Sequence, residues 1–287
     1  MPELPEVESV RRSLDKAGID APVAKVWRSR KKLRTGVAWR QENLRALQGA
    51  APGKLFRRGK FLLWQLDAGG REPLGWLVHL GMSGRFTLAD PAAPREPHTH
   101  VVVAFEDGRE VRFVDPRRFG GMRVCEWSRL HGDPPLSELG PEPLEAGFDG
   151  GVLGARAGNS KRPLRDVLLD QKIVAGVGNI YANEALFEAR LHPLLPARRL
   201  ADSAWARLAE AVVVVLERGL ANGGTTLRDY RDGDGRSGRN QHALRVYGRA
   251  GEPCQECGEA IRGFVLGGRG GAFCPKHQAR PRARRVR

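Results

Sequence analysis

The stretch HVVVAFEDGREVRFVD, residues 100–115, alternates apolar and polar side chains on both sides of an Asp-Gly pair. Asp107-Gly108 is a favoured two-residue turn, so the stretch predicts an antiparallel hairpin in which alternate residues share a face. Residues 60–66 (KFLLWQL) and 76–80 (WLVHL) read as further strands separated by a DAGGREP turn. We therefore expect the first ~130 residues to be mostly antiparallel sheet, because short turns join antiparallel strands.

A helix is predicted ahead of this sheet, over residues 5–17 (PEVESVRRSLDKA). Its apolar residues, Val7, Val10 and Leu14, recur at three- and four-residue spacing, as on one face of a helix. Pro5 suits the first turn, and Gly18 suits the stop. The first four residues of the chain therefore lie directly at a helix N-terminus.

Beyond the sheet, the Gly- and Pro-rich stretch at 131–151 is typical of a linker, and the pattern after it turns helical. Helices are predicted over 163–172, 180–190 and 203–221, followed by a polar, glycine-rich loop over 222–242. The expected fold is α+β, with an N-terminal antiparallel β-sandwich and flanking helices. The expected parts are a catalytic sandwich (1–132), a linker (133–151), a helical domain with a loop (152–242), a zinc finger (243–279) and a basic tail (280–287).

The composition points to a polyanionic partner. The 287 residues include 48 Lys and Arg against 33 Asp and Glu, a formal net charge of +15, and 41% are hydrophobic, as in a globular chain. A globular protein with this much positive charge is expected to bind a polyanion. The alternative is a basic surface that has no partner.

The chain start is acidic and lacks an apolar core segment, so no signal peptide is predicted. The longest apolar run of note, Ala211–Leu216, is far short of the roughly 18 residues that span a bilayer. We expect a cytoplasmic protein without a membrane partner.

A metal site is predicted near the C-terminus. Cys254 and Cys257 form one pair with a two-residue gap, and Cys274 and His277 form another. Thiolates and imidazole at this spacing are typical of tetrahedral zinc, and four protein ligands leave no open position, so the site is structural. A chance cluster of thiols is the alternative. Cys125 stands apart and is interpreted as a small core residue.

The N-terminus is a candidate reaction centre. If Met1 is removed, Pro2 presents a secondary amine, and terminal amines have a pKa near 8, about two units below lysine. Attack of this amine on a sugar C1′ gives a cationic iminium, which is an electron sink for β-elimination. Glu3 and Glu6 lie beside it as a candidate acid and positioning group. A helix start without chemistry is the alternative.

Three further motifs have two readings each. The turn VAGVGN, residues 174–179, suits phosphate binding at a helix start, or is an ordinary helix connection. HLGMSGR (79–85) and DPRRFG (115–120) contain Met82 and Phe119, which are either core residues or, with an arginine, a wedge for a base stack.

Taken together, these residues resemble the Fpg/Nei family, in its formamidopyrimidine-DNA glycosylase branch. The resemblance runs in order through nearly the whole chain. Its motifs are MPELPEVE (1–8), RRGKFLL (57–63), HLGMSGR, HTHV (98–101), DPRRFGG (115–121), LGPEPL (139–144), LLDQKIVAGVGNIYANEALF (168–187), GGTTLRDY (223–230), VYGRAGEPC (246–254) and the cysteine pairs.

The resemblance implies a helix–two-turns–helix domain, a zinc-finger β-hairpin, and site residues at matching positions. Pro2 is the implied Schiff-base nucleophile, Glu3 the acid that helps open the sugar ring, and Glu6 a lesion-pocket carboxylate. Lys60 and Arg269 are implied to serve phosphate contact and elimination. Met82, Arg117 and Phe119 are implied to fill the gap left by the everted base, and the implied phosphate ligands are His98, Arg118, Lys161 and Asn179.

Three departures from the family pattern stand out. His277 replaces a usual cysteine, which alters zinc affinity without abolishing it. Gly270 and Gly271 stand where alanine or small hydroxyl residues are common, which we expect to loosen the hairpin carrying Arg269. The loop GRNQHAL (238–244) lacks an aromatic residue often found where the family caps the lesion.

The function implied is a bifunctional glycosylase and abasic-site lyase. It removes oxidised purines (8-oxoguanine and formamidopyrimidines) from duplex DNA through a Pro2 Schiff base and β,δ-elimination. We expect a monomeric, nucleoid-associated bacterial enzyme with one structural zinc and no organic cofactor. The alternatives are a Nei-like glycosylase for oxidised pyrimidines, a noncatalytic DNA-damage binder and an RNA-binding protein.

Overall fold

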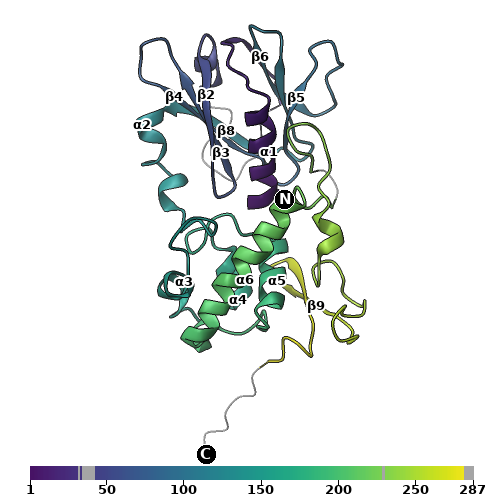
Figure 1. Cartoon of the computed structure of the whole chain (residues 1–287). Helices are drawn as coiled ribbons and strands as arrows, with labels where there is room; N and C mark the ends of the chain where they lie inside the picture. The colour runs from purple at the N-terminus through teal and green to yellow at the C-terminus, as the bar shows by residue number, and fades with distance from the viewer. Residues whose placement is uncertain (32, 34–42, 228–229, 281–287) are drawn as a thin grey trace, which may run out of the picture. The chain divides into compact units, whose positions relative to one another are not determined.

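The computed structural model describes residues 1–31, 33, 43–227 and 230–280 (Figure 1). The chain divides into two compact units. The N-terminal unit comprises Met1–Glu138 and Gly219–Gln241, and the C-terminal unit comprises Leu139–Arg218 and His242–Arg287. Most of the basic tail expected at 280–287 lies outside the described residues.

The first helix of the N-terminal unit, α1 (Leu4–Lys16), confirms the predicted helix within one residue at each end. Glu3 is its N-cap, and Gly18, with φ of +55°, follows its end. The predicted stripe of Val7, Val10 and Leu14 is buried, and α1 packs against strands of the two sheets described next.

One sheet contains the predicted hairpin. Strands β6 (Thr99–Phe105) and β7 (Glu110–Val114) pair antiparallel, with Val101 opposite Phe113 and Val103 opposite Val111. Gly108 in the turn has φ of +86°, which a glycine adopts without strain. The sheet order is β1-β6-β7-β5, with β1 at Val23–Arg28 and β5 at Arg85–Ala89.

The second sheet has the order β2-β3-β4-β8 and is also antiparallel. The two predicted strands are its centre, and its bounds are β2 Ala51–Arg58, β3 Phe61–Asp67, β4 Leu74–His79 and β8 Gly121–Glu126. The 3₁₀ helices η1 (Leu44–Leu47) and η2 (Leu136–Glu138) and the helix α2 (Trp127–Leu130) complete this part.

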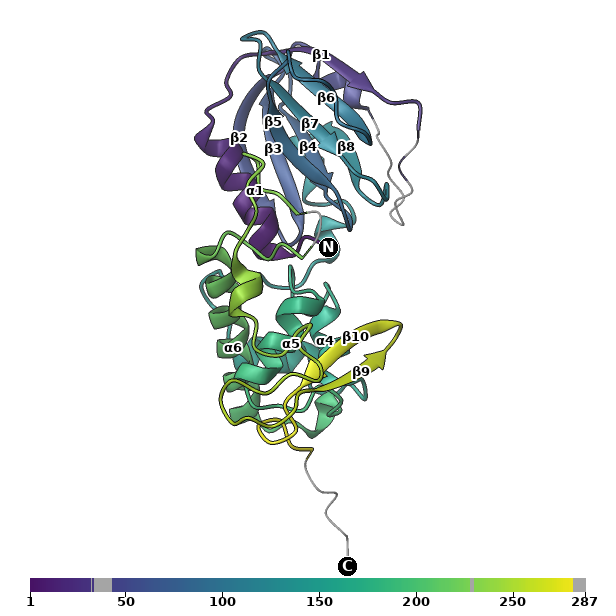
Figure 2. The same cartoon turned by 90° about the vertical axis from the view of Figure 1, so that its right-hand side faces the viewer.

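The two sheets and α1 share one hydrophobic core, which makes the N-terminal unit a β-sandwich (Figure 2). Trp76 of one sheet meets Phe86 of the other edge-to-face, with ring centroids 5.2 Å apart, and Trp64 stacks on Trp76. Burying an aromatic side chain of this size contributes about 1.5–3 kcal/mol. The expected sandwich is confirmed.

The C-terminal unit is mainly helical and ends in a hairpin. Its helices are α3 (Gly150–Ala157), α4 (Leu164–Leu169), α5 (Asn179–Glu188) and most of α6 (Asp202–Ala221), with the 3₁₀ turn η3 (Ala197–Arg199). The 3₁₀ turn η4 (Asn240–Ala243) has two residues in each unit. Strands β9 (Arg262–Leu266) and β10 (Arg269–Phe273) pair antiparallel. Helix α4 ends three residues before the predicted 172, since Asp170 is extended. Among the described residues, no helix is long and apolar enough to cross a membrane.

Candidate functional site

The start of the chain is enclosed by the fold. Pro2 is buried, while Met1 before it is 49% exposed. Glu3 and Glu6 are buried, with 2% and 1% of their surfaces exposed. The backbone N–H of Glu3 donates to Glu6 Oε2 at 2.7 Å, which is one half of a capping box. Glu3 directly follows Pro2, and the Glu6 carboxylate lies against the amide that joins Pro2 to Glu3. Both acidic side chains are therefore out of bulk water, a setting in which charge interactions are strengthened.

The glycine-rich segment after α6 closes over this carboxylate from within the same unit. The backbone N–H of Thr225 donates to Glu6 Oε1 at 2.7 Å, and Tyr230 Oη lies 3.2 Å from the carbonyl oxygen of Glu6. Burial, together with the Glu6 charge, raises the pKa of Tyr230, so the phenol keeps its hydrogen. The segment was expected within the 152–242 domain, whereas Gly219–Gln241 groups with the N-terminal unit.

Lys60 lies in the turn between β2 and β3 and is 6% exposed. His79, at the end of β4, is opposite Phe61 in the strand pairing. Burial and the nearby Lys60 charge lower the pKa of His79 from 6.5 to about 4. The imidazole is therefore neutral at pH 7, and its Nδ1 accepts the backbone N–H of Gly81 at 3.2 Å.

The side chains considered for a wedge are at the surface. Met82 is 41% exposed and Phe119 is 37% exposed, so neither is a core residue. The Arg117 guanidinium carbon lies 5.1 Å from the centroid of the Phe119 ring, a cation–π contact. Met82 lies on one loop, and Arg117 and Phe119 lie on another. The two loops pack closely, since a Cβ added at Gly81 would lie only 2.4 Å from the backbone of Phe119.

Two of the residues expected to bind phosphate have unusual backbones. His98 has φ of +66° and Arg118 has φ of +61°, the left-handed region that disfavours residues other than glycine. His98 is exposed and Arg118 is half-buried. Such conformations concentrate at functional sites.

In the C-terminal unit, Asn179 begins α5 and Arg269 begins β10. The Asn179 side-chain amide donates to the Gly270 carbonyl at 2.8 Å. The buried Arg165 of α4 donates to the Leu266 carbonyl at 2.6 Å. Arg269 and Lys161 are exposed. Side chains of α4 and α5 therefore fix both sides of the hairpin turn that carries Arg269.

The expected loosening of the hairpin at Gly271 is opposed by these contacts. A side chain at Gly271 would meet the Phe264 ring at 2.4 Å and Asn183 Oδ1 at 2.7 Å. Asn183 Oδ1 accepts the backbone N–H of Ala272 at 3.0 Å. The Phe264 ring thus fills the space of a side chain at 271. At Gly270, by contrast, no atom of the described part of the chain lies within 4 Å of an added Cβ.

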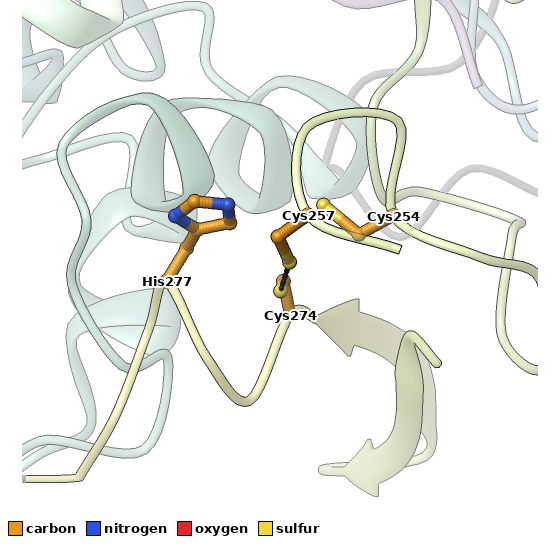
Figure 3. A group of neighbouring side chains, drawn as sticks. All are labelled: Cys254, Cys257, Cys274 and His277. Atoms are coloured by element: carbon orange, nitrogen blue, oxygen red, sulfur yellow. Dashed lines mark hydrogen bonds between the residues drawn. The ribbon is translucent and has the colours of Figure 1, made fainter. Parts of the chain in front are cut away.

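The predicted metal ligands converge on one point of the C-terminal unit (Figure 3). Ligand atoms of Cys254, Cys257, Cys274 and His277 lie within 4.8 Å of one another, and the Sγ atoms of Cys257 and Cys274 are 3.6 Å apart. His277 Nε2 is buried and has no hydrogen-bond partner among the residues that the structure describes. A bound cation would satisfy this nitrogen, so the four residues fit a closed, tetrahedral metal site.

The loop that lacks the family's aromatic residue is held by polar contacts. Asn240 is 3% exposed, and its side-chain amide donates to Thr225 Oγ1 at 2.9 Å. Its backbone N–H donates to the Gly224 carbonyl at 3.0 Å. Asn240 therefore connects the 238–241 stretch to the residue that contacts Glu6.

Several residues whose hydrogen bonds hold these sites in place are not predicted as site residues from the sequence. Asp115, Ser83 and Thr225 lie inside quoted motifs, and Arg165 lies beside one. Their burial sets them apart, since buried charged and polar groups must be paired. A buried acid in a loop cannot be distinguished from an exposed one by its sequence pattern.

Known proteins match this architecture along the chain. Residues 1–122 match the formamidopyrimidine-DNA glycosylase N-terminal domain, and residues 139–231 match the H2TH domain of that family. Formamidopyrimidine-DNA glycosylase of Moorella thermoacetica is 45% identical over 264 residues, covering 91% of this chain and 93% of that protein.

Two solved structures with damaged DNA are also similar. A mutant of Lactococcus lactis FPG in complex with Fapy-dG-containing DNA has a TM-score of 0.88 and 32% identity, covering 97% of this chain and 100% of that one. MutM in complex with carbocyclic 8-oxo-G-containing DNA has a TM-score of 0.86 and 32% identity, with the same coverage. By sequence and by fold, the chain belongs to the formamidopyrimidine-DNA glycosylase family.

Proposed function

We propose that the chain is a bifunctional DNA glycosylase and abasic-site lyase that removes oxidised purines from duplex DNA. The observation that carries the proposal is the burial of Glu3 and Glu6, 2% and 1% exposed, around Pro2. A plain helix start would leave acidic side chains in water, where ionised groups are best solvated. Burying two carboxyls beside a chain-terminal amine instead favours a reaction centre.

The proposed reaction begins after Met1 is removed. The secondary amine of Pro2 attacks the sugar C1′, and the bond from C1′ to the damaged base breaks; the base leaves with the proton that the amine gives up. Glu3 donates a proton that opens the sugar ring, leaving an iminium at Pro2. The iminium accepts electrons as the C2′ proton departs and the 3′-phosphate leaves; a second elimination, for which Lys60 and Arg269 are candidates, releases the 5′-phosphate.

The exposed wedge suits the access that this reaction needs. A base inside a duplex cannot reach a buried amine, so it must leave the stack, and the hole must be filled. This space can be filled by the apolar side chains of Met82 and Phe119. Arg117 is proposed to face the unpaired partner base. The phosphate ligands proposed for the strand are His98, Arg118, Lys161 and Asn179.

The net charge of +15 suits a DNA partner and predicts binding that weakens steeply with salt. We infer that the C-terminal site holds zinc, because three thiolates and one imidazole are its preferred ligands. Zinc would fix the loops around the β9–β10 hairpin and so support Arg269. We further propose that the protein acts as a monomer on DNA of the bacterial nucleoid.

The substrate class rests on the relatives. Damaged guanines, Fapy-dG and 8-oxo-G, are present in the DNA of the two similar complexes. The test is a panel of duplexes containing 8-oxoguanine, a formamidopyrimidine or thymine glycol, each opposite its normal partner. Faster excision of the two purine lesions supports the proposal. Faster excision of thymine glycol, or binding of all three without excision, would overturn it.

A further inference from the structure

Asp115 is a fully buried acid between β7 and the loop that carries Arg117 and Phe119, with none of its surface exposed. Its Oδ1 accepts the Ser83 hydroxyl at 2.6 Å and the backbone N–H of Arg117 at 3.2 Å. Its Oδ2 accepts the backbone N–H of Gly120 at 2.8 Å. One carboxylate thus binds both ends of the Arg117–Phe119 segment and the loop of Met82.

The backbone of the same residue binds the proposed phosphate ligands. The N–H of Asp115 donates to the His98 carbonyl at 3.0 Å. Its carbonyl accepts the N–H of Arg118 at 3.2 Å and lies 3.1 Å from His100 Nε2. A carbonyl can only accept, so His100 Nε2 carries the hydrogen of the ring.

Two of the backbone hydrogen bonds of Asp115 are made with residues in a strained conformation, His98 and Arg118. His98 and Arg118 have φ of +66° and +61°, which persist only where the surroundings dictate them. Each is bonded through its backbone to Asp115. Ser83 adds a second bond to the same loop, because its Oγ accepts the N–H of Arg117 at 3.1 Å.

We propose that Asp115, assisted by Ser83, is a positioning residue that sets the wedge and the adjacent phosphate ligands for entry into damaged DNA. The inference rests on the proposed function, because it assigns a DNA role to residues that Asp115 holds. The carboxylate touches no substrate. It acts by accepting three hydrogen bonds, from the Ser83 hydroxyl and the N–H groups of Arg117 and Gly120, in a loop that has no regular structure of its own.

The test compares Asp115→Asn with Asp107→Asn, the same change in the exposed turn of the β6–β7 hairpin. Asparagine has one acceptor oxygen, so its NH₂ group must face an N–H or O–H donor that the carboxylate now accepts. Ser83→Ala is the milder second variant. Thermal unfolding first shows that each variant is folded.

Wedge entry is measured without catalysis. The probe is a duplex with a tetrahydrofuran abasic analogue and 2-aminopurine beside it, whose fluorescence rises when the stack opens. We expect Asp115→Asn to lose most of the rise and Ser83→Ala part of it, with Asp107→Asn unchanged. A folded Asp115→Asn protein with a full rise would overturn the inference, even if the protein proves not to be an enzyme.

Catalysis supplies a second, separable readout. Asp115→Asn should slow excision of 8-oxoguanine from a duplex by on the order of 10- to 100-fold and reduce discrimination between partner bases. Borohydride trapping on a single-stranded abasic oligonucleotide, which needs no wedge, should stay within about twofold of wild type. Equal loss on both substrates would show a merely structural role. Absence of trapping by the wild-type protein would instead refute the proposed function.

Discussion

The Glu6 carboxylate accepts the backbone N–H of Thr225 at 2.7 Å, across 219 residues of sequence. Its other oxygen accepts the N–H of Glu3 at 2.7 Å. Both oxygens are therefore bound to donors before any substrate arrives. Glu6 connects the start of α1 to the glycine-rich segment that follows α6.

Glu6→Gln should weaken this connection, because the amide would place an N–H group against one of the two backbone donors. Leaving a buried donor without an acceptor costs about 1–3 kcal/mol. We expect a lower Tm and slower lesion excision. Asp15→Asn, on the exposed side of the same helix, is the control. Unchanged excision and unchanged Tm in Glu6→Gln would contradict a linking role.

Arg165→Lys should disturb the hairpin that carries Arg269, because lysine lacks the planar fork that reaches the Leu266 carbonyl and Asn179. Since Arg269 is proposed for the second elimination, the ratio of δ- to β-elimination products should fall on the order of tenfold. Denaturing gels of the cleaved strand measure this ratio. Arg162→Lys, which changes an exposed arginine nearby, should keep it, and an unchanged ratio in Arg165→Lys would refute the link.

The metal site predicts two different outcomes at one position. His277→Cys should retain one zinc per chain, because four thiolates also form a closed site. His277→Ala should lose zinc more readily to a chelator and unfold at lower temperature, since binding free energy contributes to folding. Atomic absorption and thermal unfolding measure both. Equal zinc content and equal Tm in the two variants would show that His277 is not a ligand.

The pH dependence of stability follows from His79, whose pKa is lowered to about 4 in the fold. Between about pH 6.5 and 4 the unfolded chain binds a proton that the folded chain does not, so stability falls as pH falls. The shift from 6.5 to about 4 corresponds to about 3 kcal/mol.

His79→Gln removes this titration and keeps an acceptor for the Gly81 N–H. Urea unfolding at pH 7 and pH 4.5 should show a smaller loss of unfolding free energy in His79→Gln than in wild type. The exposed His131→Gln should behave like wild type. Parallel losses in all three proteins would contradict the lowered pKa assigned to His79.

Much of the fold could be predicted because local sequence patterns determine many of its helices and strands. The Asp107-Gly108 turn and the alternation beside it determine a hairpin, and the stripe through Val7 and Leu14 determines a helix. The prediction for α4 extends three residues too far, because residues 170–172 contain no Gly or Pro stop signal although the backbone at Asp170 is extended. The edge strand β1 has little alternation, with only its first residue fully buried, and was not predicted.

The candidate site divides in the same way. Cys254 and His277 are identified by spacing, because metal geometry imposes it. Asp115, Arg165 and Thr225 each make a hydrogen bond to a residue far away in the sequence, Ser83, Leu266 and Glu6 respectively. Such bonds leave no spacing rule in the sequence. Asp115 in particular begins the motif DPRRFGG, which contains two arginines. The same sequence is expected for an exposed aspartate that pairs with an arginine, so the motif does not predict its burial.

The central claim is that Pro2 is the nucleophile. The most direct measurement mixes the purified protein with a duplex carrying 8-oxoguanine opposite cytosine, reduces with borohydride, and maps the adduct by mass spectrometry. The account predicts one covalent DNA adduct on the peptide that begins at Pro2, with Met1 absent. An adduct on Lys60 or another lysine, or no adduct although the damaged duplex is bound, would contradict it.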